Sequence, residues 1–503
     1  MKKLFSFLLA LCSLFSSADS EALIGEDALP GLLLEDFAQE QAVETSHSVM
    51  IGDRRINYTA TAGTMVVSSG GEQCEIFYTA YTRDEVDDLN ARPITFAFNG
   101  GPGSASLWLH MGLLGPRRME LDDEGRAAAF PAALVDNEES ILDLTDLVFI
   151  DPVGTGYSRA VNGSSDAAFL GYENDIRSVG DFIRLYVNRS GRWGSPKYLA
   201  GESYGTTRAV GVCEYLHDVY GMGLNGLMLI SCANDFTTLI DQPGNDLPYA
   251  IFLPTYAADA WYHGVLKDEY QDMELEAFLE EVRQFVRADY VPALFRGRSL
   301  SKDEMEQLAE QLAAYTGLSK ELFLSSSLRV NLDDFCFGLL ADDGLAVGRL
   351  DGRVTGPVTG GSLGEGASDP SMASEDIIFT AAVNQYMTNE LEYQTDLPYI
   401  PLSGDVSMAW SMDSDNAYLA QENTIFECMC KNSFLKVWVL SGYYDGATPF
   451  FGTEWIYDHV FLGEEQQKNL TMSYYPSGHM FYLNGESRAL FREQAEDWYG
   501  AES

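Results

Sequence analysis

The stretch KYLAGESYGTT, residues 197–207, contains a serine at the centre of the pattern Gly-x-Ser-x-Gly. The apolar run before this serine predicts a buried strand, and the residues from Thr206 onward have the pattern of a helix that ends near Gly221. A serine between a strand and a helix, flanked by glycines that permit a tight turn, has its hydroxyl exposed at the edge of a sheet. This context predicts that Ser203 is a nucleophile.

A second match to the pattern, GGSLG at 360–364, is centred on Ser362. It lies in a segment rich in Gly, Ser and Asp, with neither a strand pattern before it nor a helix pattern after it. We interpret Ser362 as a loop residue.

Short apolar runs that end in Gly, Asp or Asn recur along the chain, and helical patterns lie between several of them. Runs of this kind are typical of strands buried on both faces of a parallel sheet. They are ITFAFNGG (94–101), DLVFIDPVGTG (146–156), KYLAGES (197–203), LMLISCAND (227–235), VWVLSGYYD (437–445) and TMSYYPSGH (471–479). The alternation predicts an α/β fold with a mostly parallel central sheet flanked by helices, and ligands bind such sheets at the carboxyl ends of the strands.

Two regions depart from this alternation. Residues 47–83 are rich in β-branched and aromatic residues and predict antiparallel strands. Between 237 and 430 the alternation stops, and helical patterns at 267–290 and 302–315 predict an inserted, mainly helical cap. We therefore expect a signal peptide at 1–20, the first part of the core at 21–236, the cap at 237–430 and the second part of the core at 431–503.

A nucleophilic serine needs a general base and an acid that orients the base. In α/β-hydrolases these groups follow the serine in the order acid, then histidine. Three histidines follow Ser203, and of these only His479 stands in a loop directly after a core strand, since His459 lies in an amphipathic helix and His263 opens the cap. Asp445 ends the preceding core strand. The predicted triad is Ser203, His479 and Asp445.

An oxyanion hole needs two backbone N–H donors, one from the residue after the nucleophile and one from a Gly-rich loop after an early strand. Tyr204 and the loop at 96–106 are suitable. Five motifs, in this order along the chain, resemble those of the serine carboxypeptidase family: NGGPGSAS (99–106), DPVGTGYS (151–158), GESYG (201–205), YYDGATP (443–449) and SGHM (477–480).

The resemblance implies the α/β-hydrolase fold and a role for each matching residue. The implied roles are triad members Ser203, Asp445 and His479, oxyanion amides of Gly101 and Tyr204, and holders of the substrate's terminal carboxylate Asn99, Gly100 and Glu202. A carboxyl group can donate a hydrogen bond to a carboxylate only when it is protonated, so Glu202 in this role implies activity at acid pH.

The sequence departs from the family pattern at three positions. A second glutamate of the family, ahead of a Gly-Pro pair, is Leu113 here, a tryptophan is Ile141, and the cysteine that usually follows the GGPG turn is Ser104. The first change removes a carboxyl that family members use to hold and tune Glu202. Serine hydrolysis does not need this carboxyl, whereas recognition of a C-terminal carboxylate uses it in the family.

The composition excludes several partners. With 31 Lys and Arg against 76 Asp and Glu, the formal net charge is −45, which repels nucleic acid and anionic membranes. The basic MKK and the apolar run at 4–15 predict a signal peptide too short to span a bilayer, and we expect export without a stable membrane anchor.

We expect no cofactor and no metal, because the CMC sequence at 428–430 has no His or Cys cluster of zinc-like spacing around it. Six cysteines follow the predicted signal peptide, and their pairing stays open: Cys74, Cys213, Cys232, Cys336, Cys428 and Cys430.

The function predicted from these features is an exported serine carboxypeptidase that acts on peptides or proteins through an acyl-enzyme. Two alternatives stay open. One is another serine hydrolase on the same fold, such as an esterase, an acyltransferase or a peptidase that does not require a free C-terminus. The other is a non-catalytic binding protein, which the complete triad disfavours.

Overall fold

The computed structural model describes residues 40–122, 125–127, 129–131, 133–358, 369–372, 375–414 and 418–500. The predicted signal peptide and Ser362 lie outside the described residues.

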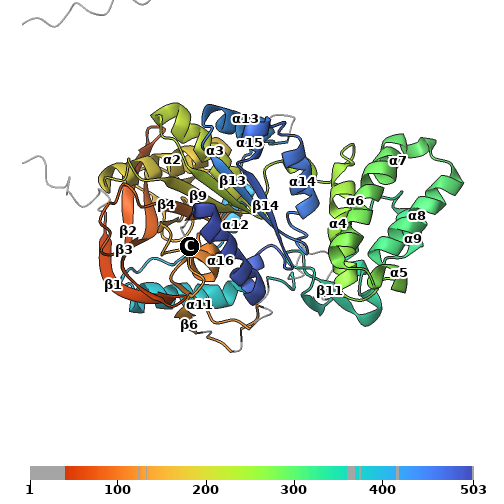
Figure 1. The fold of residues 1–503 in the computed structure, drawn as a ribbon, viewed down its shortest axis with the longest axis horizontal. Helices are drawn as coiled ribbons and strands as arrows, with labels where there is room; N and C mark the ends of the chain where they lie inside the picture. Colours follow the sequence, from red (N-terminus) through yellow and green to blue (C-terminus); the bar gives the residue numbers. More distant parts are fainter. Residues whose placement is uncertain are drawn as a thin grey trace, which may run out of the picture. The chain divides into compact units, whose positions relative to one another are not determined.

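The central feature is a ten-stranded sheet with the order β1-β2-β3-β7-β4-β9-β10-β13-β14, in which β8 pairs with β3 (Figure 1). Pairing is antiparallel from β1 to β7 and parallel from β7 to β14. The strands are β1 (Ala42–Ile51), β2 (Arg54–Ser69), β3 (Glu72–Arg83), β4 (Ile94–Phe98), β7 (Asp146–Ile150), β8 (Arg159–Ala160), β9 (Lys197–Glu202), β10 (Gly226–Ile230), β13 (Lys436–Gly442) and β14 (Leu470–Tyr475). The mostly parallel α/β sheet predicted from the apolar runs is confirmed.

Helices cover both faces of the parallel strands. In β10, Leu227 and Leu229 face a cluster of buried side chains that includes helices α2 (Tyr172–Arg189), α3 (Tyr204–Tyr220) and α13 (Glu422–Lys431). Met228 and Ile230 face the opposite cluster, which includes the π-helix η2 (His110–Leu114) and helices α11 (Glu375–Asn389) and α16 (Gly485–Tyr499). Since successive side chains of a strand point to opposite faces, the parallel strands are apolar throughout.

The segment after β10 forms a third buried cluster, which is helical. Its helices are α4 (Leu247–Tyr262), α6 (Leu275–Phe285), the π-helix η5 (Val286–Tyr290), α7 (Val291–Arg296), α8 (Lys302–Thr316), α9 (Lys320–Ser325) and α10 (Leu332–Gly338). Arg283 of α6 pairs with Glu454 of α14 (Phe450–Asp458) at 2.8 Å, which attaches this cluster to the helix that follows β13. The later helix α11, also within 237–430, packs instead against the sheet.

Shorter elements complete the described fold. They are α1 (Leu107–Leu109), β5 (Arg117–Met119), β6 (Leu134–Asp136), η3 (Asp166–Phe169), η4 (Phe236–Thr238), α5 (Asp268–Gln271), η6 (Gly297–Ser299), η7 (Ala341–Asp343), β11 (Leu345–Val347), β12 (Thr355–Pro357), α12 (Gly404–Ala409), α15 (Glu464–Gln467) and η8 (Phe481–Leu483). Within the described ranges, no helix combines the length and hydropathy needed to cross a membrane.

Candidate active site

Ser203 occupies a strained turn between β9 and α3. Its φ of 60° and ψ of −130° are values that non-glycine residues rarely adopt, and such strain persists only where surrounding contacts enforce it. Its main-chain nitrogen donates to the oxygen of Ile230 at 2.9 Å, which ties the turn to the end of β10. A side chain on Gly201 would collide with the main chain of Gly205, so the two glycines allow the strand and the helix to approach closely.

Asp445 and His479 lie at the same edge of the sheet as Ser203. Each follows the carboxyl end of a parallel strand, β13 or β14, and these strands continue the sheet from β9 and β10. Nδ1 of His479 donates to Oδ2 of Asp445 at 2.8 Å, and both side chains are buried. Because a carboxylate only accepts, the imidazole carries its proton on Nδ1 and leaves Nε2 free to act as a base.

Asp445 is held by further donors that the sequence did not reveal. The main-chain nitrogens of Ala447 and Thr448 donate to Oδ1 at 2.8 and 2.9 Å, and the hydroxyl of Thr448 donates to Oδ2 at 2.7 Å. Burial lowers the pKa of His479, but the charge of Asp445 and its hydrogen bond outweigh burial and leave that pKa raised. The arrangement therefore stabilises an imidazolium at His479.

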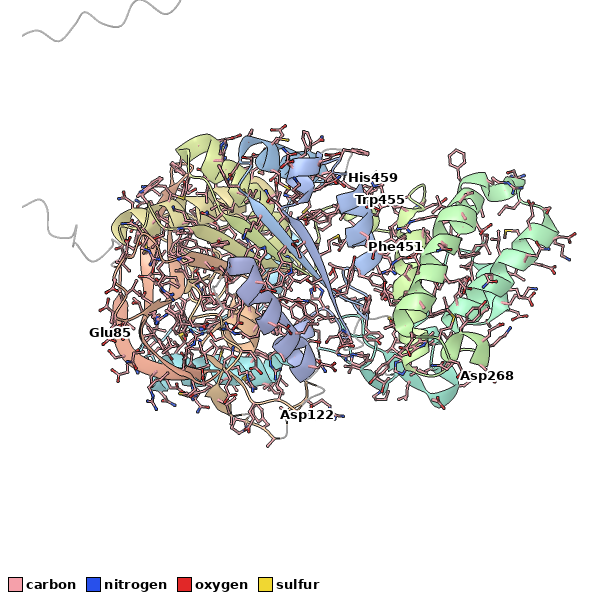
Figure 2. All side chains as sticks on the ribbon, in the orientation of Figure 1. Glu85, Asp122, Asp268, Phe451, Trp455 and His459 are labelled. Carbon is pink, nitrogen blue, oxygen red and sulfur yellow. The ribbon has the colours of Figure 1, made fainter. Side chains whose placement is uncertain are left out.

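The other two histidines after Ser203 make different contacts. Nε2 of His263 lies 2.7 Å from the main-chain oxygen of Gly352. His459 stacks on Trp455 at the end of α14, with ring centroids 4.1 Å apart (Figure 2). Of the three, His479 is the one that contacts Asp445.

The loop after β4 lies directly against the turn at Ser203. A Cβ on Gly100 would collide with the main-chain nitrogens of Tyr204 and Gly205, and a Cβ on Gly205 would lie 2.8 Å from the oxygen of Phe98. Gly101 has a φ of 95°, which L-residues rarely adopt. The structure thus brings together the two segments predicted to supply oxyanion amides, those of Gly101 and Tyr204.

Arg208, which the sequence analysis did not single out, joins these segments. It is fully buried in α3, its Nε donates to Asp175 at 2.7 Å, and its Nη1 donates to the main-chain oxygen of Asn99 at 2.6 Å. The guanidinium also lies over the rings of Phe98 and Tyr204, each centroid 5.3 Å away. In the sequence, the one sign of this role was the position of Arg208, five residues after the proposed nucleophile.

Glu202 is a buried carboxyl group next to Ser203 in the chain. Burial raises its pKa to about 7 and the charge of Asp445 adds to the rise, whereas His479 and hydrogen bonds from Tyr482 and Asn99 oppose it. The hydroxyl of Tyr482 donates to Oε2 of Glu202 at 2.7 Å. Glu202 is therefore protonated in acid solution and loses its proton near neutrality.

The amide of Asn99 has a defined orientation. Its Oδ1 accepts a hydrogen bond from the main-chain nitrogen of Leu109 at 3.0 Å. This contact leaves the NH₂ group of Asn99 as a donor, and that group donates a hydrogen bond to the carboxyl of Glu202. Asn99 and Glu202 thus form one polar pair beside Ser203.

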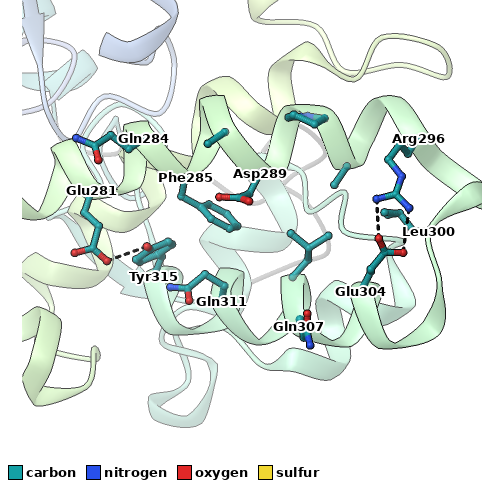
Figure 3. A pocket seen from close by; sticks show the side chains of 14 residues that line it. Glu281, Gln284, Phe285, Asp289, Arg296, Leu300, Glu304, Gln307, Gln311 and Tyr315 are labelled. Carbon is teal, nitrogen blue, oxygen red and sulfur yellow. Dashed lines mark hydrogen bonds and ion pairs between the residues drawn. The ribbon is translucent and has the colours of Figure 1, made fainter.

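A groove of about 750 Å³ lies elsewhere, between the helices of the insertion (Figure 3). It is lined by residues of α6, η5, α7 and α8, and Glu304 in its wall is paired with Arg296 at 2.7 Å. None of the residues predicted for catalysis lines it.

The fold and the Asp445–His479 pair beside a strained serine turn define the α/β-hydrolase class. The structure is similar to that of Kex1(delta)p, a prohormone-processing carboxypeptidase from Saccharomyces cerevisiae, with a TM-score of 0.54 and 16% identity over 88% of this chain and 91% of that chain. Within this class, residues 53–227 match the serine carboxypeptidase family. The family resemblance predicted from the five motifs is confirmed.

A curated relative gives the same result over a shorter stretch. The chain is 30% identical over 132 residues to serine carboxypeptidase-like 29 from Arabidopsis thaliana. This match covers 26% of this chain and 25% of the relative, so it spans about a quarter of the relative's length. Asp445 and His479 lie beyond the family match at 53–227, and their placement rests on the geometry described above.

Proposed function

We propose that this protein is an exported serine carboxypeptidase that releases C-terminal residues from peptides or proteins at acid pH. The observation that carries this proposal is the buried carboxyl of Glu202 beside Ser203, with a pKa raised to about 7 by burial. A neutral acid next to a nucleophile is suited to bind a substrate carboxylate, which an ionised glutamate would repel.

In the proposed reaction, Oγ of Ser203 attacks the scissile carbonyl carbon and transfers its proton to Nε2 of His479. Asp445 stabilises the imidazolium through the hydrogen bond to Nδ1. The amides of Gly101 and Tyr204 stabilise the oxyanion. His479 then gives its proton to the leaving amine, and the C–N bond breaks to leave an acyl-enzyme.

A water molecule completes the cycle. His479 takes one proton from the water, the oxygen attacks the acyl carbon, and the proton returns to Oγ of Ser203 as the shortened peptide leaves. These steps balance with the peptide substrate, one water molecule and the residues of the chain.

Recognition of the terminal carboxylate is assigned to Asn99, Gly100 and Glu202. The NH₂ group of Asn99 and the proton of Glu202 are donors on neighbouring segments, and Gly100 lies against the turn that carries Ser203. An acceptor-only ligand such as a carboxylate is held well by such a set of donors.

The experiment compares a blocked dipeptide free acid with its C-terminal amide from pH 3 to 8. We expect faster cleavage of the free acid at acid pH, covalent labelling of Ser203 by a fluorophosphonate, and loss of both in Ser203→Ala. Equal cleavage of the two substrates at every pH would favour the second candidate function, that of an esterase, an acyltransferase or another peptidase. Leu113 keeps this candidate open, because it replaces a glutamate that the family uses in carboxylate recognition.

Export rests on the sequence alone. We expect the mature chain to begin between Asp19 and Leu23, where small residues precede the junction. Sequencing the N-terminus of the exported protein tests this, and a retained Met1 in the active protein would contradict it.

A further inference from the structure

Tyr482 makes a polar contact that no sequence motif indicated. Its fully buried side chain comes from η8, three residues after His479, and its hydroxyl donates to Oε2 of Glu202 at 2.7 Å. Burial and the neighbouring carboxyl hold the pKa of Tyr482 well above its usual range. Tyr482 is therefore a neutral hydrogen-bond donor over the whole range in which Glu202 titrates.

The ring of Tyr482 has little freedom to move. A Cβ on Gly112 of η2 would lie 2.5 Å from Cε2 of the ring, so the ring is packed directly on the glycine backbone. Nη1 of Arg488 donates to the main-chain oxygen of Tyr482 at 2.8 Å, and the ring of Phe481 lies 5.7 Å away in an edge contact. Leu113, at the family's second glutamate position, is the next residue of η2 and is itself fully buried.

We propose that Tyr482 is a positioning residue for recognition of the substrate's terminal carboxylate, in place of the carboxyl that Leu113 removes. The inference rests on the proposed function. Since Oε2 of Glu202 accepts the hydrogen bond from Tyr482, the proton of Glu202 resides on Oε1, from which it is donated to the substrate. The tyrosine thereby selects which carboxyl oxygen accepts and which donates.

The replacement of a carboxyl by a phenol has a consequence for pH dependence. The groups that act on Glu202 are His479, Tyr482, Asp445 and Asn99. A second carboxyl would share protons with Glu202 and make the pair titrate in two coupled steps. Tyr482 does not ionise in this range, so free-acid cleavage falls with rising pH through the loss of one proton, from Glu202.

The experiment uses Tyr482→Phe in the full-length protein, which keeps the ring packed on Gly112 and removes only the hydroxyl. We expect kcat/KM for the free-acid peptide to fall about 3- to 10-fold, mostly through KM, because the hydrogen bond lost joins two groups that are neutral in the reactive form. Cleavage of the C-terminal amide stays unchanged. The alkaline limb for the free acid moves to higher pH, since the hydrogen bond from Tyr482 lowers the pKa of Glu202.

Tyr499→Phe is the matched control. Tyr499 donates to or accepts from Oγ1 of Thr95 at 2.8 Å, near the start of β4 and so at the opposite end of that strand from Asn99. We expect it to leave the ratio of free-acid to amide cleavage unchanged. An unchanged ratio in a folded Tyr482→Phe protein would overturn the inference.

A second measurement does not depend on turnover. Infrared difference titration of the Glu202 carboxyl, assigned with Glu202→Gln, gives its pKa in the unmutated protein and in Tyr482→Phe. A higher pKa of Glu202 in the variant supports the role of Tyr482. If the unmutated protein shows no preference for free acids, that separate result refutes only the proposed function. An identical titration in both proteins overturns the inference.

Discussion

The buried guanidinium of Arg208 donates a hydrogen bond to the main-chain oxygen of Asn99 at 2.6 Å and so joins the helix after Ser203 to the loop that carries Gly100 and Gly101. The same guanidinium is paired with Asp175 of α2 at 2.7 Å. The relative positions of the nucleophile and the oxyanion loop thus depend on one side chain with two bonds in a fixed geometry.

Arg208→Lys should reveal this dependence. A lysine keeps the charge but cannot form both bonds, so we expect a loss of about 2–4 kcal/mol in the free energy of unfolding and about a tenfold fall in kcat/KM. Denaturant unfolding and peptide kinetics measure the two effects. Arg192→Lys is the control, because Arg192 is a buried arginine paired with Asp146 at 2.5 Å at the start of β7. It should lose stability but keep the kcat/KM of the folded enzyme.

Thr448→Val should lower kcat about 3- to 30-fold and leave KM nearly unchanged. The hydroxyl of Thr448 donates to the carboxylate oxygen that also accepts from His479, so its loss frees Asp445 to move and weakens the stabilisation of imidazolium. Thr448→Ser restores a hydroxyl and should restore most of kcat. A valine variant with unchanged kcat would show that Asp445 is held sufficiently by its backbone donors.

Glu202→Gln should change the shape of the pH profile. Glu202 has to be protonated and His479 neutral in the reactive form, so the unmutated enzyme loses free-acid cleavage as the pH rises through about 7. An amide donates at every pH, and the variant should therefore retain its free-acid cleavage above neutrality. Its acid limb should stay in place, because Glu202 is already uncharged on the acid side of the profile. A profile identical to that of the unmutated enzyme would remove Glu202 from carboxylate recognition.

Leu113→Glu should push the optimum for free-acid cleavage upward. A second carboxyl close to Glu202 would raise the pKa of one member of the pair. Leu113 is fully buried, so the variant should also lose stability, and its melting temperature has to be compared with that of Leu113→Gln. An unchanged optimum in a folded protein would mean that the side chains at 113 and 202 do not meet.

Stability should decline as the pH rises from about 4 to 7. Burial raises the pKa of Asp151 to about 6 and that of Glu202 to about 7, from ordinary values of 3.8 and 4.5. The folded state therefore binds protons that the unfolded chain has released. At acid pH each group adds on the order of 3 kcal/mol to the free energy of unfolding, and this contribution is lost across the window. The buried His110, whose pKa burial lowers to about 3, offsets part of this decline, so thermal melting from pH 4 to 8 is measured in the unmutated protein and in Asp151→Asn, which should lose less stability across the window. A maximum near pH 8 would contradict these shifts.

The sequence alone determined the elements that depend on local pattern. Strands buried on both faces are apolar throughout, so the parallel strands were visible as short runs, and each ended in a turn residue. The glycines around Ser203 and the predicted positions of Asp445 and His479 at strand ends followed from the same local rules. The raised pKa of Glu202, about 7, comes mainly from burial, which the local sequence pattern does not show.

Only the tertiary structure decided which side chains from distant segments meet. Tyr482 reaches Glu202 because β14 and β9 belong to the same sheet, with β10 and β13 between them, and because Gly112 leaves space for the ring. Arg208 contacts Asn99 because α3 packs against the end of β4. No local sequence pattern marks Tyr482 or Arg208 as a site residue. The hydrogen-bond partner of each is fixed by the order of strands in the sheet and by the packing of the core. A sequence specifies the turns that carry functional groups, whereas long-range packing determines the hydrogen bonds that orient them.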